Sequence, residues 1–163
     1  MRKNFLIFIG IFASLAASRF IPHPPNFTSL IALSFYVPAI LGMIHIPSLI
    51  ISFAITDLII GYHFGTHWTW GSVLLIGLIS QYFNKNLIWR ISGALSGAII
   101  FYIITNFGVW TTGMYGLDMN GILKTYLLAV PFFTYSVLST MIFSVFIEML
   151  YKFYNSKKIK LID

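Results

Sequence analysis

The stretch Arg19-Phe20-Ile21-Pro22-His23-Pro24-Pro25-Asn26-Phe27-Thr28 interrupts an otherwise apolar chain and decides how the flanking segments are interpreted. Its three prolines lack an N–H donor and favour an extended backbone, which predicts a stiff connector rather than a helix. Such a connector, between two hydrophobic segments, is suited to holding its arginine, histidine and asparagine in place for a ligand. The alternative is a plain helix stop followed by a tight turn.

The composition around this connector is that of a membrane protein. Hydrophobic residues make up 58% of the 163 residues, charged residues only 9%, and the mean hydropathy is +0.88. A soluble domain carries about 25% charged residues. We therefore expect one integral membrane domain over residues 1–163, with the lipid bilayer as a partner. The absence of cysteine excludes disulfides and thiolate metal sites.

Six apolar segments are candidates for membrane-spanning helices, since a span needs about 20 mostly apolar residues. The fold class expected is thus all-α, a single bundle of six transmembrane helices. The first segment has a basic start but no convincing cleavage site, so we interpret it as a retained span rather than a signal peptide. The expected spans are 4–21, 28–43, 47–62, 68–83, 87–107 and 125–151.

The basic residues predict the orientation of the bundle. With six spans, eight lysines and arginines fall on the side of the termini, whereas Arg19 and Lys124 fall on the other side. Lysine and arginine are enriched on the cytoplasmic side. We expect a bacterial inner-membrane protein with both termini cytoplasmic and outer connections at 22–27, 63–67 and 108–124. The net charge of +6 does not indicate a nucleic-acid partner, because most of the basic residues lie beside the ends of the expected spans.

Asp57 is the most informative residue inside a span. A carboxylate there is costly and should face the bundle interior with a partner. Arg19, at the outer end of the first span, is the natural partner. Two interpretations stay open: an ion pair that locks the first and third spans together, or an acid that binds a substrate or a cation.

His63 and His67 are four residues apart, which would place both imidazoles on one face of a helix, as in some metal sites. Gly65 and the outer turn weaken the assumption of a helix. A metal site with Asp57 and His23 is one alternative; interfacial or substrate-contacting histidines are the other, and we expect no metal.

Two patterns of small residues four apart, Ala13/Ala17 and Gly93/Gly97, allow close approach of helices. Packing inside the bundle is the default interpretation. The alternative, which we adopt for Ala13 and Ala17, is docking of a partner subunit.

Asn106 and Trp110 flank the longest outer connection. Amides and aromatic rings near a cavity mouth suit a small polar ligand, although anchoring at the lipid interface explains Trp110 equally well. No catalytic motif or phosphate-binding loop is present, so we expect neither an enzyme nor a cofactor.

Several stretches together resemble an uncharacterised bacterial membrane family marked by its Pro-His-Pro-Pro-Asn-Phe loop. They are 19–28, Asp57 with His63, Thr105-Asn106-Phe107-Gly108-Val109-Trp110 and Ala129-Val130-Pro131-Phe132-Phe133. No activity comes with this resemblance.

The architecture is also similar to the S components of energy-coupling-factor transporters. That resemblance implies a vitamin-like substrate bound near the outer face under the 19–28 loop. It also implies that Ala13 and Ala17 dock on a transmembrane coupling subunit that works with ATPases. Arg2 stands where metal-specific members carry a histidine, which counts against nickel or cobalt.

We therefore expect a substrate-binding membrane subunit for uptake of a small polar compound. A non-transport scaffold of the cell envelope is the alternative, and an intramembrane enzyme the third. The candidate substrate-binding residues are Arg19, His23, Asn26, Asp57, His63, His67, Asn106 and Trp110.

Overall fold

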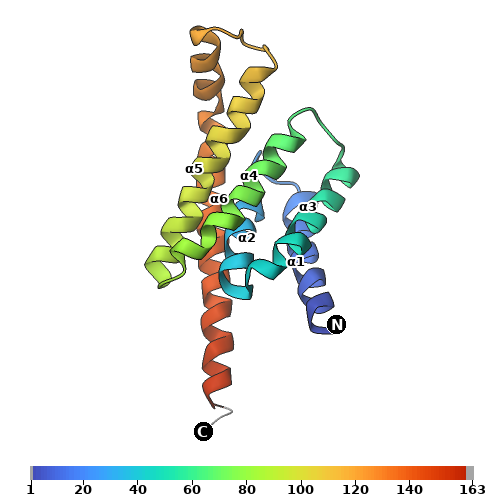
Figure 1. Ribbon diagram of the computed structural model, residues 1–163, viewed down its shortest axis with the longest axis vertical. Helices are drawn as coiled ribbons and strands as arrows, with labels where there is room; N and C mark the ends of the chain where they lie inside the picture. The colour runs from blue at the N-terminus through green and yellow to red at the C-terminus, as the bar shows by residue number, and fades with distance from the viewer. Residues whose placement is uncertain (1, 161–163) are drawn as a thin grey trace.

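The structure is a computed structural model that describes residues 2–160, without the side chains of Lys3 and of residues 157–160. The described chain is helical and contains no strand, which confirms the expected all-α class (Figure 1). Six α-helices are joined by short connections and by one π-helical and two 3-10 segments. The elements are α1 (Arg2–Phe20), α2 (Leu30–Tyr36), η1 (Val37–Leu41), η2 (Met43–His45), α3 (Ile46–Ile60), α4 (Thr66–Ile79), η3 (Ser80–Phe83), α5 (Leu87–Thr111) and α6 (Met119–Lys160).

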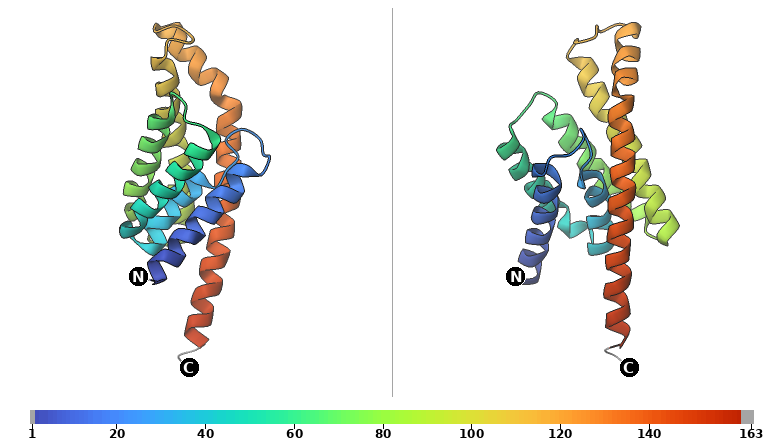
Figure 2. Two further views of the ribbon diagram at one scale, coloured as in Figure 1. Left: turned by 90° about the vertical axis from the view of Figure 1, so that its right-hand side faces the viewer. Right: turned by 180° about the vertical axis from the view of Figure 1, so that it is seen from behind.

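The connections alternate between the two ends of the molecule. Connections 21–29, 61–65 and 112–118 lie toward one end, here called the loop end (Figures 1 and 2). Both ends of the described chain, and the α2–α3 and α4–α5 connections, lie toward the other, here called the terminal end. The sequence predicts this division of connections and termini between two ends. That the terminal end faces the cytoplasm stays a prediction.

The α2 helix forms the centre of the bundle. All seven of its residues are buried, and it contacts α3, α4, α5 and α6. A helix that is apolar all round is typically enclosed on every side. Pro38 lacks the N–H that would continue α2, and the chain widens into η1 before Gly42 ends it at a φ of 97°. Segment 28–43 is therefore a short central helix, not the spanning helix expected.

By length and apolar composition, three helical stretches are able to cross a membrane: Met43–Ile60, Leu87–Thr111 and Met119–Ser156. Asn4–Phe20 and Leu30–Leu41 are apolar but shorter. The six expected spans thus correspond to six helices of unequal length, of which the described chain provides three of full spanning length.

The α6 helix begins six residues earlier than expected. The side chain of Asp118 explains this start, because its Oδ1 accepts the backbone N–H of Gly121 at 2.8 Å. An acidic side chain in this position satisfies an amide that has no partner within the helix. The outer connection is consequently 112–118 rather than 108–124, and Lys124 lies on α6.

The two small-residue patterns differ in their surroundings. Gly93 is buried, and a Cβ there would overlap the side chains of Phe35 and Phe83; Gly97 packs on Ile76. This pattern packs inside the bundle, as the default interpretation expects. Ala13 and Ala17, by contrast, are exposed on α1, which packs against α3. For them the default of packing within the bundle is wrong.

Substituting Gly93 with alanine should therefore destabilise the protein, since overpacking costs about 1–3 kcal/mol. Gly71 is the matched control, because it is exposed on α4 and a Cβ there meets no atom within 4 Å. Gly71→Ala should keep or raise the melting temperature in detergent, as alanine is favoured over glycine in helices by about 1 kcal/mol. Equal losses in the two variants would contradict this packing.

Candidate ligand-binding cavity

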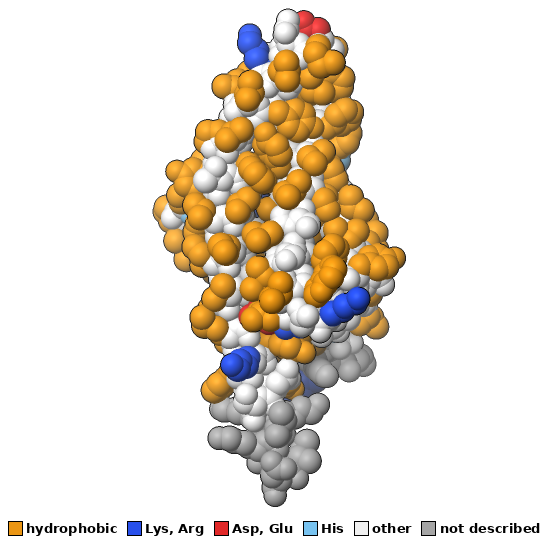
Figure 3. Space-filling model, turned by 90° about the vertical axis from the view of Figure 1, so that its left-hand side faces the viewer, with side chains coloured by type: hydrophobic (Ala, Val, Ile, Leu, Met, Phe, Trp, Pro, Cys, Tyr) orange, Lys and Arg blue, Asp and Glu red, His pale blue; other side chains and the backbone are white. Residues whose placement is uncertain are grey.

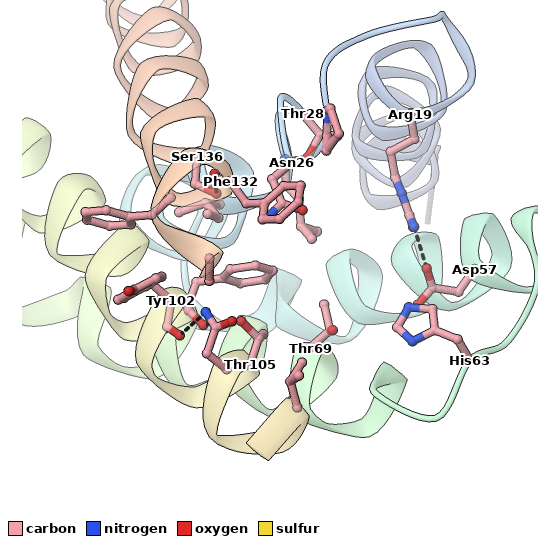
Figure 4. A pocket seen from close by; sticks show the side chains of 18 of the residues that line it. Arg19, Asn26, Thr28, Asp57, His63, Thr69, Tyr102, Thr105, Phe132 and Ser136 are labelled. Carbon is pink, nitrogen blue, oxygen red and sulfur yellow. Dashed lines mark hydrogen bonds and ion pairs between the residues drawn. The ribbon is translucent and has the colours of Figure 1, made fainter. Parts of the chain in front are cut away.

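A cavity of about 530 Å³ lies toward the loop end, between α1, the 21–29 connection, α3, α4, α5 and α6. Sites for small molecules span roughly 300–1,000 Å³. Arg19, Asp57 and His63 lie on one side of it, and Tyr102 and Thr105 on the other (Figure 4). The remaining lining residues are His23, Pro25, Asn26, Thr28, Leu30, Ile31, Phe53, Ile60, Thr69, Phe101, Asn106, Val109, Ala129, Phe132, Phe133 and Ser136.

Six of the eight residues proposed from the sequence line this one cavity, although they come from five elements: α1, the 21–29 connection, α3, the 61–65 connection and α5. They are Arg19, His23, Asn26, Asp57, His63 and Asn106. The other two, His67 and Trp110, lie outside it. Tyr102, Thr105, Phe132, Phe133 and Ser136 complete the cavity and were not proposed, because hydroxyls and phenylalanines in apolar helices are too common to stand out.

The proline-rich connection folds into a tight turn. The N–H of Phe27 donates to the carbonyl oxygen of Pro24 at 3.0 Å, and Asn26 adopts a φ of 63°. Proline at the second position and asparagine in the left-handed region at the third are typical of a type II turn. The turn is thus determined by Pro25 and Asn26, and it places the Asn26 side chain at the cavity.

Hydrogen bonds hold both ends of this connection. The hydroxyls of Ser18 and Ser29 lie 2.8 Å apart, which joins the end of α1 to the start of α2. In the middle of the connection, the carbonyl oxygen of Asn26 lies 3.4 Å from the Ser139 hydroxyl of α6, which also lies 3.1 Å from the carbonyl oxygen of Ser136. The connection thus contacts α6 as well as the ends of α1 and α2 that it joins, and it contains the tight turn that the sequence left as an alternative.

Asp57 makes the ion pair predicted from the sequence. Its Oδ1 lies 2.5 Å from Nη2 of Arg19, and the residue is 5% exposed. Sequence reasoning missed the second partner: the indole N–H of Trp70 donates to Oδ2 at 2.6 Å. The carboxylate thus links α1, α3 and α4.

Arg19 also makes two contacts besides the one with Asp57. Its Nη1 donates to the Thr56 hydroxyl at 2.5 Å, and its guanidinium carbon lies 4.6 Å from the centre of the Phe53 ring. A buried pair of this kind is compensated when hydrogen bonds satisfy both groups. The two charges therefore cancel within the cavity wall.

The opposite wall is made by α5 and α6, which two tyrosines join reciprocally. Tyr102 donates its hydroxyl to the carbonyl oxygen of Tyr126 at 2.6 Å, and Tyr126 donates to that of Ile103 at 2.8 Å. Asn106 uses its Nδ2 to donate to the Tyr102 carbonyl oxygen at 2.7 Å. Within the described residues its Oδ1 has no donor, so this oxygen remains an acceptor for a ligand.

His63 and His67 are not on one helical face. His63 belongs to the 61–65 connection, where its Nδ1 accepts the N–H of Gly65 at 3.1 Å. His67 is exposed in the first turn of α4, with its ring near those of Phe64 and Trp68. The described residues contain no group of three histidines or acids close enough to hold a metal ion.

Trp110 is a partly buried residue of α5 beside Phe107, with ring centres 5.5 Å apart. Its indole N–H is buried and has no partner among the described residues. Asn106, only one helical turn away, does line the cavity. The sequence does not predict that Asn106 lines the cavity and Trp110 does not, because it predicts a loop over 108–124, whereas α5 continues to Thr111.

A second ion pair toward the terminal end was also missed. Arg90 donates from Nε and Nη2 to the two carboxylate oxygens of Glu148, at 2.6 and 2.7 Å. Glu148 is a lone acid within an apolar helix, as Asp57 is. A carboxylate in an apolar span needs a partner, so Glu148 in segment 125–151 predicts a basic partner just as Asp57 does.

The chain belongs to the Family of unknown function (DUF6580), whose profile matches residues 1–161. This confirms the resemblance to an uncharacterised family. No curated protein and no solved structure matches the chain.

The Arg19–Asp57 pair should behave as one unit. Asp57→Asn leaves a buried arginine uncompensated and should cost roughly 3–5 kcal/mol. The double variant Arg19→Gln/Asp57→Asn should lose less than the sum of the two single changes, as measured by melting temperature in detergent.

The control combines Asp57→Asn with Glu148→Gln, which removes an acid near the other end of the bundle. These two losses should add to within about 0.5 kcal/mol. Strict additivity in the Arg19/Asp57 cycle would show that the pair is not energetically coupled.

Proposed function

We propose that this protein is an integral membrane protein that binds a small, uncharged polar molecule in the loop-end cavity, as the substrate-binding subunit of an uptake system. The observation that carries this proposal is the cavity itself. Six residues singled out in the sequence converge on one space whose charged wall is internally compensated.

Membrane embedding is supported by the surface. In an 18-residue window of the Leu87–Thr111 stretch only 28% of the residues are buried, and in one of the Met119–Ser156 stretch only 22%, so most of the side chains there are at least partly exposed. Hydrophobic atoms cover the middle of the face in Figure 3, with charged atoms near its two ends. Lys85, Arg90 and Lys152 lie toward the terminal end, and this distribution supports cytoplasmic termini. If α3, α5 and α6 cross the membrane, helices α1, α2 and α4 complete the bundle and need not each be long enough to span it.

The chemistry of the lining supports an uncharged ligand. Arg19 and Asp57 satisfy each other, so neither offers a free charge. Asn106 Oδ1 and the Asn26 side-chain amide have no partner within the described residues and supply an acceptor and a donor. Phenylalanine rings from α3, α5 and α6 complete the lining with apolar surface: Phe53, Phe101, Phe132 and Phe133. A compound that combines hydroxyl or amide groups with a ring or apolar part, as a vitamin-like molecule does, fits this set.

Docking of a transmembrane coupling subunit is supported by the exposed stripe of Ala13 and Ala17. A Cβ at Gly10, one turn earlier, also meets no atom within 4 Å, so small residues extend along this face of α1. Small side chains let a partner helix approach closely within a membrane.

Two histidines of the loop end provide a matched test of the cavity. His63 lines the cavity and His67 does not. His63→Ala should reduce the amount of co-purified small molecule about 2–10-fold, the range expected for one lost hydrogen bond, whereas His67→Ala should leave it unchanged. Mass spectrometry of the ligand released from purified protein measures this. If both variants retained as much ligand as the wild type, His63 would not be part of the site. If both lost it equally, the loop-end cavity would not be where the ligand binds.

Leucine at Ala13 or Ala17 tests the docking face. Because both residues are exposed, Ala13→Leu and Ala17→Leu should change stability by less than about 0.5 kcal/mol. Ligand retention should persist while uptake in cells is lost. A large fall in melting temperature would place the stripe in the core, and unchanged uptake would exclude docking there.

A further inference from the structure

The Arg90–Glu148 pair lines a groove between α5 and α6, toward the terminal end. The groove has a volume of about 480 Å³. Leu87 and Ile91 of α5 form one apolar wall, and Val145 and Met149 of α6 form the other. Its polar lining residues are Arg90, Glu148, Tyr151, Lys152, Asn155 and Ser156.

The charges in the groove do not cancel. Both oxygens of Glu148 accept hydrogen bonds from Arg90, so the charge of this acid is compensated by Arg90. Within the described residues, Nη1 of Arg90 has no acceptor, and Lys152 is exposed with no carboxylate within 4 Å. The groove therefore carries one unpaired positive charge and an unused guanidinium N–H beside apolar walls.

We propose that this groove binds one anionic phospholipid. Its phosphodiester lies between Arg90 Nη1 and the Lys152 ammonium, and an acyl chain lies along Leu87, Ile91, Val145 and Met149. Basic pockets between helices near the cytoplasmic surface bind anionic headgroups in this way. The proposal rests on the membrane embedding proposed above and does not depend on the ligand of the loop-end cavity.

The apolar walls favour a lipid over free phosphate. Inorganic phosphate would satisfy the cations and leave the walls uncovered, whereas a phospholipid covers both. Glu148 is not an obstacle, because its bidentate pair with Arg90 neutralises it and orients the guanidinium.

The test is native mass spectrometry of the full chain in detergent, titrated with phosphatidylglycerol or with phosphatidylcholine. The wild type should bind one phosphatidylglycerol in preference to phosphatidylcholine. Lys152→Gln should lower the ratio of lipid-bound to free protein about fivefold, the effect of one cation near a headgroup. Lys152→Arg should restore most of the binding.

Lys124→Gln is the matched control, since Lys124 is an exposed lysine near the other end of the same helix. It should leave the ratio unchanged. Equal binding of the two lipids, or equal losses in the two glutamine variants, would overturn the lipid site. So would displacement of the lipid by millimolar inorganic phosphate, because a free anion would then be the occupant. A protein that stays soluble without detergent would overturn membrane embedding itself, which is a separate outcome.

Discussion

The buried carboxylate of Asp57 is the constraint on which the loop end depends. In an apolar bundle this charge has to be compensated, and it receives Arg19 from α1 and Trp70 from α4. Arg19 lies in the last turn of α1, directly before the proline-rich connection. The pair therefore ties the end of α1 to α3, next to the connection that contains the turn at Pro25 and Asn26. One wall of the cavity follows from that single interaction.

The bundle has polar sites at both ends and an apolar centre. The fully buried α2 fills that centre, and an ion pair lies toward each end: Arg19–Asp57 toward the loop end and Arg90–Glu148 toward the terminal end. At the loop end both members of the pair are satisfied, which leaves a cavity lined by amides, hydroxyls and rings. At the terminal end an unpaired lysine adds positive charge. An ion pair between a buried acid and an arginine thus occurs at both ends, but the loop-end cavity has no net charge from its pair, whereas the groove at the terminal end has a positive charge from Lys152.

Much of this architecture follows from patterns that the sequence displays. Long apolar runs predict the helices, and the rarity of charges inside them predicts that Arg19 and Asp57 meet. Glu148, an acid within another apolar run, predicts a basic partner for the same reason, and that partner is Arg90. The central position of α2 was not predictable in this way, because a segment buried by protein and one facing lipid are equally apolar. The placement of His67 and Trp110 outside the cavity depends on where α4 begins and where α5 ends. At the start of α4, for example, the backbone N–H of His63 donates to the hydroxyl oxygen of Thr66 at 3.1 Å, and a sequence does not display such local hydrogen bonds.

A crystal or cryo-EM map of the protein, extracted from its native membrane without added ligand, tests the central claim most directly. We predict non-protein density in the loop-end cavity that contacts Asn106 Oδ1 and the Phe132 ring, beside an intact Arg19–Asp57 pair. A cavity that holds only ordered water would contradict it. So would a ligand whose own charged group has displaced Arg19 from Asp57.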